Sequence, residues 1–160
     1  MNSFETCDAA QPESEPESEL EALRRREVEV LARTLYGEAR GETVRGIEAV
    51  ACVIVNRANR AKVRGHYWWG DSIEEVCTKA WQFSCWNEND PNRAKILAVA
   101  PGHRVFDACV RIARRAASGC LVDVTKGATH YHTKTVTPLW SRGRGVCAEI
   151  GQHLFYNDIE

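Results

Sequence analysis

The sequence predicts one α+β domain that is mainly helical, with short β segments confined to its last third. Apolar residues recur with the period of a helix between residues 28 and 61, and again between residues 102 and 118. After Asp123 the pattern changes to short β-like segments separated by turn signals. Because 160 residues can bury a core of their own, a single folded domain is expected.

Composition and charge limit the classes of function. No apolar run reaches the roughly 18–20 residues that span a bilayer, so we expect no membrane insertion. The N-terminus lacks the basic and apolar regions of a signal peptide, which predicts synthesis in the cytoplasm. Residues 1–21 hold seven acidic residues and no basic one, which predicts a disordered acidic tail before a domain over 22–160. That domain is modestly basic and suits an anionic polymer, either nucleic acid or cell wall.

The first two helices are predicted over about 21–40 and 43–61, with Gly41 between them. They form a tight hairpin with Glu38 near its elbow. Residues 62–92 are irregular and aromatic around a short helix at about 72–79, and four of the five tryptophans lie there. Such tryptophans either stack on sugars or bases, or fill a small core.

Two further helices are predicted over about 90–99 and 102–118. The β segments follow at 128–133, 146–150 and 153–156, with turn signals between them.

Glu38 is the first catalytic candidate. The apolar side of its helix is formed by Val28, Leu31, Ala32, Leu35 and Ala39. Glu29, Arg33 and Arg40 fall roughly opposite, where we expect water to solvate them. Glu38 lies at the margin, where partial desolvation raises the pKa of a carboxyl and suits it to general acid catalysis. The alternative is an ordinary solvated residue. A second carboxylate is not fixed by spacing; the candidates are Glu42, Asp71, Glu74, Glu75, Glu88 and Asp90.

Histidines and cysteines offer rival chemistries. His130 and His132 lie on one face of a predicted strand and, with His153 and either His66 or His103, suggest a zinc site. A structural or substrate-contacting role is favoured for them, so no metal and no other cofactor is predicted.

The seven cysteines form no Cys-x-x-Cys pair. Cys52 and Cys109 lie on apolar helix faces and are expected to be inert core residues, while a disulfide between Cys77 and Cys85 is an open alternative.

Five blocks in chain order resemble the SleB/CwlJ-type cell-wall hydrolases. They are ARTLYGEARGE at 32–42, GIEAVACVIVNR at 46–57, QFS at 82–84, GATHY at 127–131 and GQHLFY at 151–156. The resemblance implies a lysozyme-like, lytic-transglycosylase-like fold. It also implies cleavage of peptidoglycan glycan strands at the β-1,4 bond between N-acetylmuramic acid and N-acetylglucosamine.

Within this resemblance, Glu38 aligns with the catalytic acid. Hydrogen bonds to the substrate are expected from Ser84, Thr129 and Tyr131, and stacking on sugar faces from Trp81, Phe83 and Trp86. The other expected substrate-binding positions are Tyr36, Gln82, His130, His153 and Phe155.

The run WQFSCWNENDPNR at 81–93 is similar to forms of the family encoded by phages and prophages of proteobacteria. It implies an endolysin that a separately encoded holin releases from the cytoplasm to the periplasmic cell wall. The alternatives are a zinc-dependent wall amidase or peptidase, a non-catalytic wall-binding module of a phage particle and, more weakly, a nucleic-acid binder.

Overall fold

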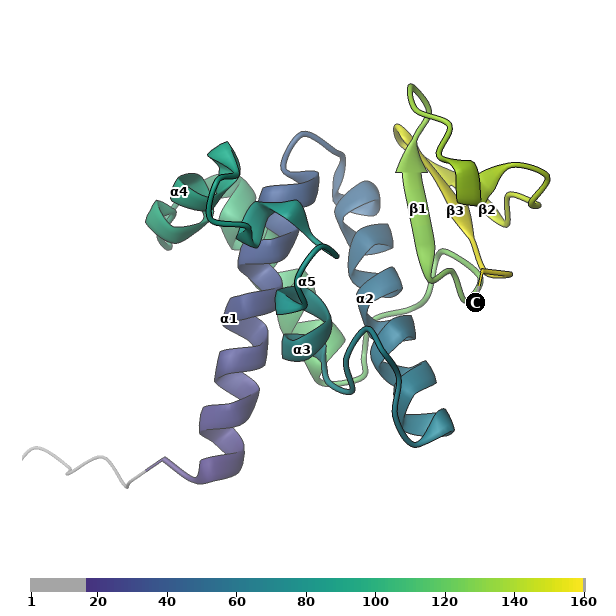
Figure 1. Ribbon diagram of the computed structural model, residues 1–160. Helices are drawn as coiled ribbons and strands as arrows, with labels where there is room; N and C mark the ends of the chain where they lie inside the picture. The colour runs from purple at the N-terminus through teal and green to yellow at the C-terminus, as the bar shows by residue number, and fades with distance from the viewer. Residues whose placement is uncertain (1–16, 160) are drawn as a thin grey trace, which may run out of the picture.

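The helices and strands of the computed structural model, which describes residues 17–159, follow the predicted order (Figure 1). The helices are α1 Glu19–Ala39, α2 Val44–Arg64, α3 Ile73–Thr78, α4 Pro91–Ala98 and α5 Arg104–Ala117. The strands are β1 His130–Thr133, β2 Ala148–Ile150 and β3 His153–Tyr156, and short 3-10 turns lie at η1 Ser84–Trp86 and η2 Leu139–Ser141. The mainly helical α+β class is confirmed. Within the described residues, no helix combines the length and the apolar character needed to cross a bilayer.

Both long helices extend beyond their predicted bounds. Ser18 caps α1 through a capping box with Glu21, so the expected tail residues 19–21 form the first helical turn. The expected tail otherwise lies mostly outside the described residues. Helix α2 continues to Arg64, because Gly65 is the first residue that adopts a left-handed conformation, at φ 81°.

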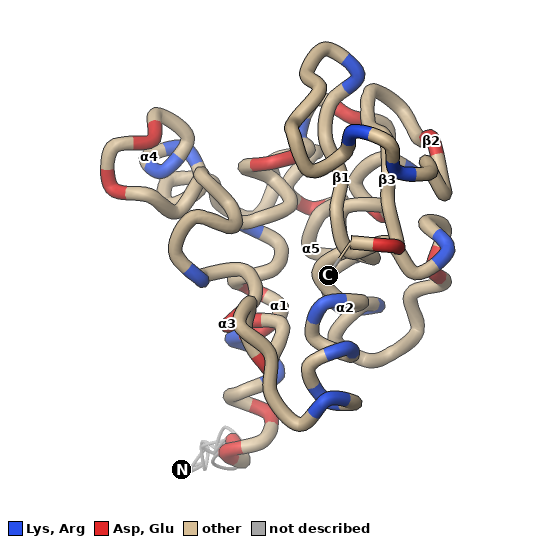
Figure 2. Tube along the Cα trace, turned by 45° about the vertical axis from the view of Figure 1, so that its right-hand side comes forward, with Lys and Arg blue, Asp and Glu red and all other residues tan. Residues whose placement is uncertain are grey.

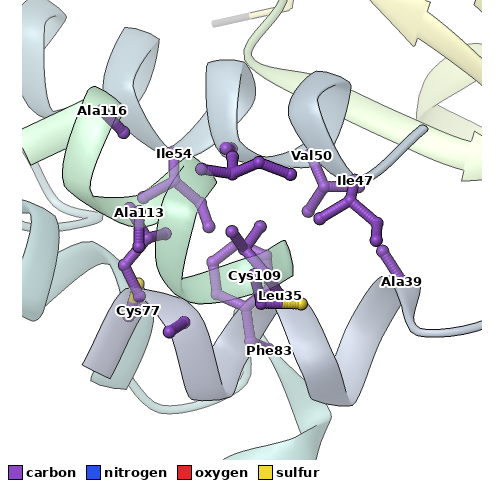
Figure 3. Close-up of a cluster of buried hydrophobic side chains, with 14 of the residues drawn as sticks. Leu35, Ala39, Ile47, Val50, Ile54, Cys77, Phe83, Cys109, Ala113 and Ala116 are labelled. Carbon is purple, nitrogen blue, oxygen red and sulfur yellow. The ribbon is translucent and has the colours of Figure 1, made fainter. Parts of the chain in front are cut away.

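The main core lies between α1, α2 and α5, with α3 and η1 closing its side (Figure 3). Leu31 and Leu35 of α1 meet Val50 and Ile54 of α2, and all four side chains are fully buried. Cys77, Cys85 and Cys109 are free thiols in this core, and Cys52 is a free thiol that is buried on α2 outside it. The inert role predicted for Cys52 and Cys109 is therefore confirmed, and the disulfide between Cys77 and Cys85 is not formed.

The expectation that Arg33 is solvated was wrong, because α4 and α5 pack against that side of α1. The guanidinium of Arg33 donates to the carbonyls of Ile96 and Val99 and lies over the ring of Phe106. Arg40 donates to Asn92 Oδ1 at 2.7 Å. Both arginines therefore attach α1 to the segment that contains α4.

The three strands form an antiparallel sheet in the order β1-β3-β2. Its register pairs Tyr131 with Phe155 and Thr133 with His153, so these four side chains share one face. His130 and His132 occupy the opposite face. Phe155 packs with Ala49 and Val53 of α2, and this second cluster attaches the sheet to the helices.

Arg57 connects the segments on the two sides of the α1 C-terminus. It belongs to a row of basic residues on α2 (Figure 2) but is itself buried. Its Nε donates to the carbonyl of Thr129 before β1, and its NH1 donates to Gln82 Oε1 before η1, both at 2.7 Å. Its guanidinium also lies 5.5 Å from the ring centroids of Trp69 and Phe83. Desolvation lowers the pKa of Arg57 to about 10, which leaves it charged at neutral pH.

The close approach of η1 to α1 yields a first prediction. A Cβ atom on Gly37 would lie 2.7 Å from Cys85 Cβ and 3.0 Å from Ile96 Cγ2. We expect Gly37→Ala to displace η1 and to lower the free energy of unfolding by about 1–3 kcal/mol, measured by urea denaturation. Gly41→Ala is the control, because nothing lies within 4 Å of its Cβ position. Equal stability of the two variants would contradict this packing.

A second prediction concerns Arg57. Arg57→Ala leaves the Thr129 carbonyl and the Gln82 amide without their donor, so we expect a loss of about 2–4 kcal/mol of unfolding free energy. Arg57→Lys keeps the charge but not the planar fork, and should recover only part of this loss. Urea denaturation measures both variants against Arg45→Ala, an exposed position on the same helix. An Arg57→Ala protein as stable as the Arg45→Ala protein would refute the connection.

Candidate active site

Glu38 lies in the last turn of α1, half-buried beneath η1. The backbone N–H of Cys85 donates to Glu38 Oε1 at 3.4 Å, and the Cys85 thiol lies within hydrogen-bonding reach. Burial raises the pKa of Glu38 more than these two donors lower it. The predicted half-buried carboxyl with a raised pKa is therefore confirmed, and this is the property that a general acid requires.

Two neighbouring charges act on Glu38 in opposite directions. The negative charge of Asp90 raises the pKa of Glu38, and the positive charge of Arg40 lowers it. Asp90 caps α4, where its carboxylate accepts the Asn92 N–H at 2.7 Å. That bond and one from the Ser84 side chain lower the pKa of Asp90. The surroundings therefore move the two pKa values apart, that of Glu38 upward and that of Asp90 downward, and such a divergence separates acid from carboxylate roles in active sites.

Tyr131 approaches the same carboxyl from the sheet. Burial and the charge of Glu38 raise the pKa of its phenol, so the hydroxyl stays protonated. The ring stacks on Phe155 at 5.7 Å and meets His153 edge-on at 5.1 Å. Glu38 therefore lies in contact with Cys85, and Tyr131 on β1 is close enough for the charge of Glu38 to act on its phenol. In Figure 1, α4 lies on one side of the α1 C-terminus and the sheet on the other.

An open pocket of about 730 Å³ lies beside this group, with Trp81, Trp86 and Asp90 among its lining residues. Glu38 does not line the pocket, but Trp86 connects the two, because its indole N–H donates to Thr34 Oγ1 one turn before Glu38. Trp81 is 89% exposed and has φ 69°. A bulky residue in this conformation is strained, and such strain is concentrated at functional sites.

Four expected substrate-binding residues have buried side chains. Phe83 and Phe155 are core residues: Phe83 packs in the main core (Figure 3), and Phe155 packs against Ala49 and Val53 from the sheet. Thr129 is also buried, and its hydroxyl contacts His130 Nδ1. His153 is 5% exposed and faces Glu42 rather than solvent. Their side chains are directed into the protein, and direct contact of these four with glycan stays a prediction.

Three more expected contacts lie apart from Glu38. The Gln82 amide is engaged within the protein, by Arg57 and by the Trp69 carbonyl. The ring of Tyr36 packs against His103 and Phe106 of α5, away from η1. His130 lies on the other face of the sheet from Tyr131, with Trp69 and Trp140. Burial and the charges of Arg57 and Arg60 lower the pKa of His130 to about 4, so it is neutral at pH 7.

The three histidines of the zinc alternative do not converge. His130 and His132 share one face of the sheet and His153 lies on the other. The ring of His132 bonds to the Tyr156 hydroxyl at 2.9 Å. Across the described residues 17–159, no three His, Cys, Asp or Glu side chains are placed to hold a metal ion.

The expected residues that remain at the site are Glu38, Tyr131, exposed Ser84, and Trp81 and Trp86 at the adjoining pocket. The roles of Cys85 and Arg57 were not predicted, and Asp90 was named only as one of six candidate carboxylates. Cys85 follows QFS directly and Arg57 ends the 46–57 block, so the matched motifs contained the signal for two of the three.

Residues 41–156 match the Cell Wall Hydrolase family. A spore cortex-lytic enzyme of Halalkalibacterium halodurans is 32% identical over 134 residues, which are 82% of this chain and 34% of that protein. The chain thus spans about a third of the length of this curated relative.

Two solved structures share the fold. The catalytic domain of Bacillus cereus SleB aligns with a TM-score of 0.63 and 24% identity over 82% of this chain and 90% of its own. The catalytic domain of the germination-specific lytic transglycosylase SleB of Bacillus anthracis aligns with a TM-score of 0.61 and 25% identity, over 81% and 93%. The chain belongs to the cell wall hydrolase family and has the lysozyme-like fold of the SleB catalytic domains.

Proposed function

We propose that the chain cleaves peptidoglycan glycan strands at the β-1,4 bond between N-acetylmuramic acid and N-acetylglucosamine, with Glu38 as the single acid and base. The main support is the half-buried Glu38 carboxyl, whose pKa burial raises, enclosed by Cys85 and Tyr131. The family match begins at residue 41, three positions after Glu38, so its role rests on this geometry. The similar proteins, a spore cortex-lytic enzyme and a lytic transglycosylase, agree with this substrate class.

In the first step, protonated Glu38 donates its proton to the glycosidic oxygen as the bond from C1 of N-acetylmuramic acid breaks. The leaving N-acetylglucosamine departs with a hydroxyl group, and C1 develops oxocarbenium character. Glu38 is now ionised, close to the positive charge that forms at C1. The Cys85 N–H stabilises this carboxylate through the bond that it already makes in the resting site.

In the second step, the ionised Glu38 accepts a proton from the hydroxyl that attacks C1. Attack by the C6 hydroxyl of the same sugar forms a 1,6-anhydro ring, and attack by water gives a reducing end. Either route returns Glu38 to its protonated form, so no other group must change its net protonation.

Substrate contacts are assigned to the exposed and half-buried residues around Glu38. Tyr131 and Ser84 supply hydrogen bonds to the acetamido groups. Trp81 and Trp86, which line the adjoining pocket, stack on the faces of flanking sugars. The endolysin role, with release by a holin and action in the periplasm, belongs to the same proposal and rests on the resemblance of residues 81–93 to phage-encoded forms.

The function is tested with Glu38→Gln. General acid–base catalysis contributes about 10²–10⁴-fold, so we expect this variant to bind purified sacculi but to release almost no soluble fragments. Mass spectrometry of wild-type products identifies the bond, since an anhydro end weighs one water less than a reducing end. The exposed Glu29→Gln on the same helix is the control.

Three outcomes would refute the assignment: near wild-type activity of Glu38→Gln, loss of wild-type activity in excess chelator, or tighter binding to DNA than to sacculi.

Glu38→Gln should also change the stability of the protein. Because the pKa of Glu38 is raised in the folded state, ionisation destabilises the fold as pH rises above the unfolded value. Glu38→Gln should therefore raise Tm at pH 7 relative to wild type, and this gain should disappear below pH about 4.

A second test concerns the pocket. Trp81 is 89% exposed, so Trp81→Ala should leave Tm nearly unchanged while raising KM about 5- to 100-fold through the loss of sugar stacking. Trp68→Ala is the matched control, since Trp68 is 58% exposed and does not line the pocket. Equal KM values for the two variants, measured from initial rates of fragment release, would remove Trp81 from the binding site.

A further inference from the structure

Glu42 occupies a slot that two glycines create. It follows the α1 C-terminus, and its carboxylate lies between Gly46 of α2 and Gly151 of the β2–β3 turn. A Cβ atom would lie 2.9 Å from Glu42 Oε2 if placed on Gly46, and closer still on Gly151. The Gln152 N–H donates to the same oxygen at 3.4 Å. The helix elbow and the sheet therefore meet at this one carboxylate, whose side chain is 13% exposed.

His153 lies behind Glu42 with an unsatisfied polar atom. Its Nδ1 is buried, has no hydrogen-bond partner in the described structure, and lies 3.5 Å from Glu42 Oε1. Leaving such a group unpaired costs about 1–3 kcal/mol, and an apolar side chain in the same place would avoid that cost. A buried imidazole with an unpartnered ring nitrogen therefore points to a role other than packing.

The other neighbours of the imidazole lead to the candidate active site. Its ring meets Tyr131 edge-on at 5.1 Å, and Tyr131 is the residue that approaches Glu38. We propose that Glu42 and His153 are positioning residues, which orient Tyr131 toward Glu38 through an Nδ1–H···Oε1 contact that shortens when glycan binds. This inference rests on the proposed glycan cleavage. Catalytic hydrogen bonds are often long in a free enzyme and tighten in its substrate complex.

The charge state of His153 makes the arrangement sensitive to pH. Burial lowers the pKa of His153, the charge of Glu42 on the elbow raises it, and His132 on β1 lowers it further. Tyr131 contacts the ring but stays neutral. At neutral pH the imidazole is therefore uncharged and holds one ring proton, which Nδ1 donates toward Glu42. Acid adds a second proton and alters the contact with Tyr131.

The test uses Glu42→Gln, His153→Leu and the double variant, assayed by fragment release from saturating sacculi. We expect kcat to fall about 10- to 100-fold in each single variant with little change in KM, as for a misplaced catalytic contact. The double variant should be no slower than the slower single variant, because the two side chains act as a unit. Protonation of His153 should make kcat of the wild type fall as the pH is lowered, which gives its pH profile an acid limb. His153→Asn, whose amide can reach Glu42 but does not titrate, should retain kcat at pH 7 and lose this acid limb.

Nuclear magnetic resonance of the His153 ring provides a readout that does not require activity. Glu42→Gln removes the charge that raises the pKa of His153, so its titration midpoint should move to lower pH, and the acid limb of kcat should move with it. Glu149→Gln is the control, since this carboxylate lies in the same hairpin but pairs with Lys134 at the surface.

An unchanged midpoint in Glu42→Gln, additive losses in the double variant, or an acid limb that stays in place would overturn the positioning role. Failure of the proposed function would look different. Glu38→Gln would then remain active while the midpoint of His153 still moved in Glu42→Gln.

Discussion

The buried guanidinium of Arg57 is the interaction on which the candidate active site depends. Glu38, Cys85 and Tyr131 come from three segments with little direct contact between η1 and β1. Arg57 donates to both segments at once, to Gln82 before η1 and to Thr129 before β1. No described carboxylate neutralises its charge; a carbonyl, an amide and the faces of Trp69 and Phe83 stabilise it instead. A planar fork suits this task, since one residue can supply two directed donors and a flat surface for the rings.

This arrangement explains why the pKa of one carboxyl near the elbow is raised while that of a neighbouring carboxyl is lowered. With η1 on one side and Tyr131 on the other, Glu38 is partly desolvated, and this raises the pKa of its carboxyl. Asp90 follows η1 closely in the chain but caps α4 at the surface. Hydrogen-bond donors there lower the pKa of its carboxyl. The pKa of each group thus follows from what covers it, not from its residue type.

Much of the fold was predictable because helical period and turn residues are local signals. All five α-helices and the three strands were anticipated within a few residues. Which side of an element meets a neighbour was less predictable: Arg33 looked solvated until α4 and α5 covered it. The burial of the aromatic residues was not predictable for a related reason. Residues 62–92 have no period that separates an inward ring such as Phe83 from an outward one such as Trp81. Strand alternation did separate His130 from Tyr131, but only the register with β3 shows which face meets α2.

Glycines around the elbow add a constraint that sequence patterns do not reveal. Gly37 admits Cys85 against α1, while Gly46 and Gly151 admit the Glu42 carboxylate. At each place a missing side chain lets a polar group approach the backbone more closely than a Cβ atom allows. Two carboxylates four residues apart consequently have different environments: Glu38 faces a backbone donor beneath η1, and Glu42 faces an imidazole in the sheet. Since Tyr131 lies next to both Glu38 and that imidazole, the close approaches connect the acid to the sheet as well as to η1.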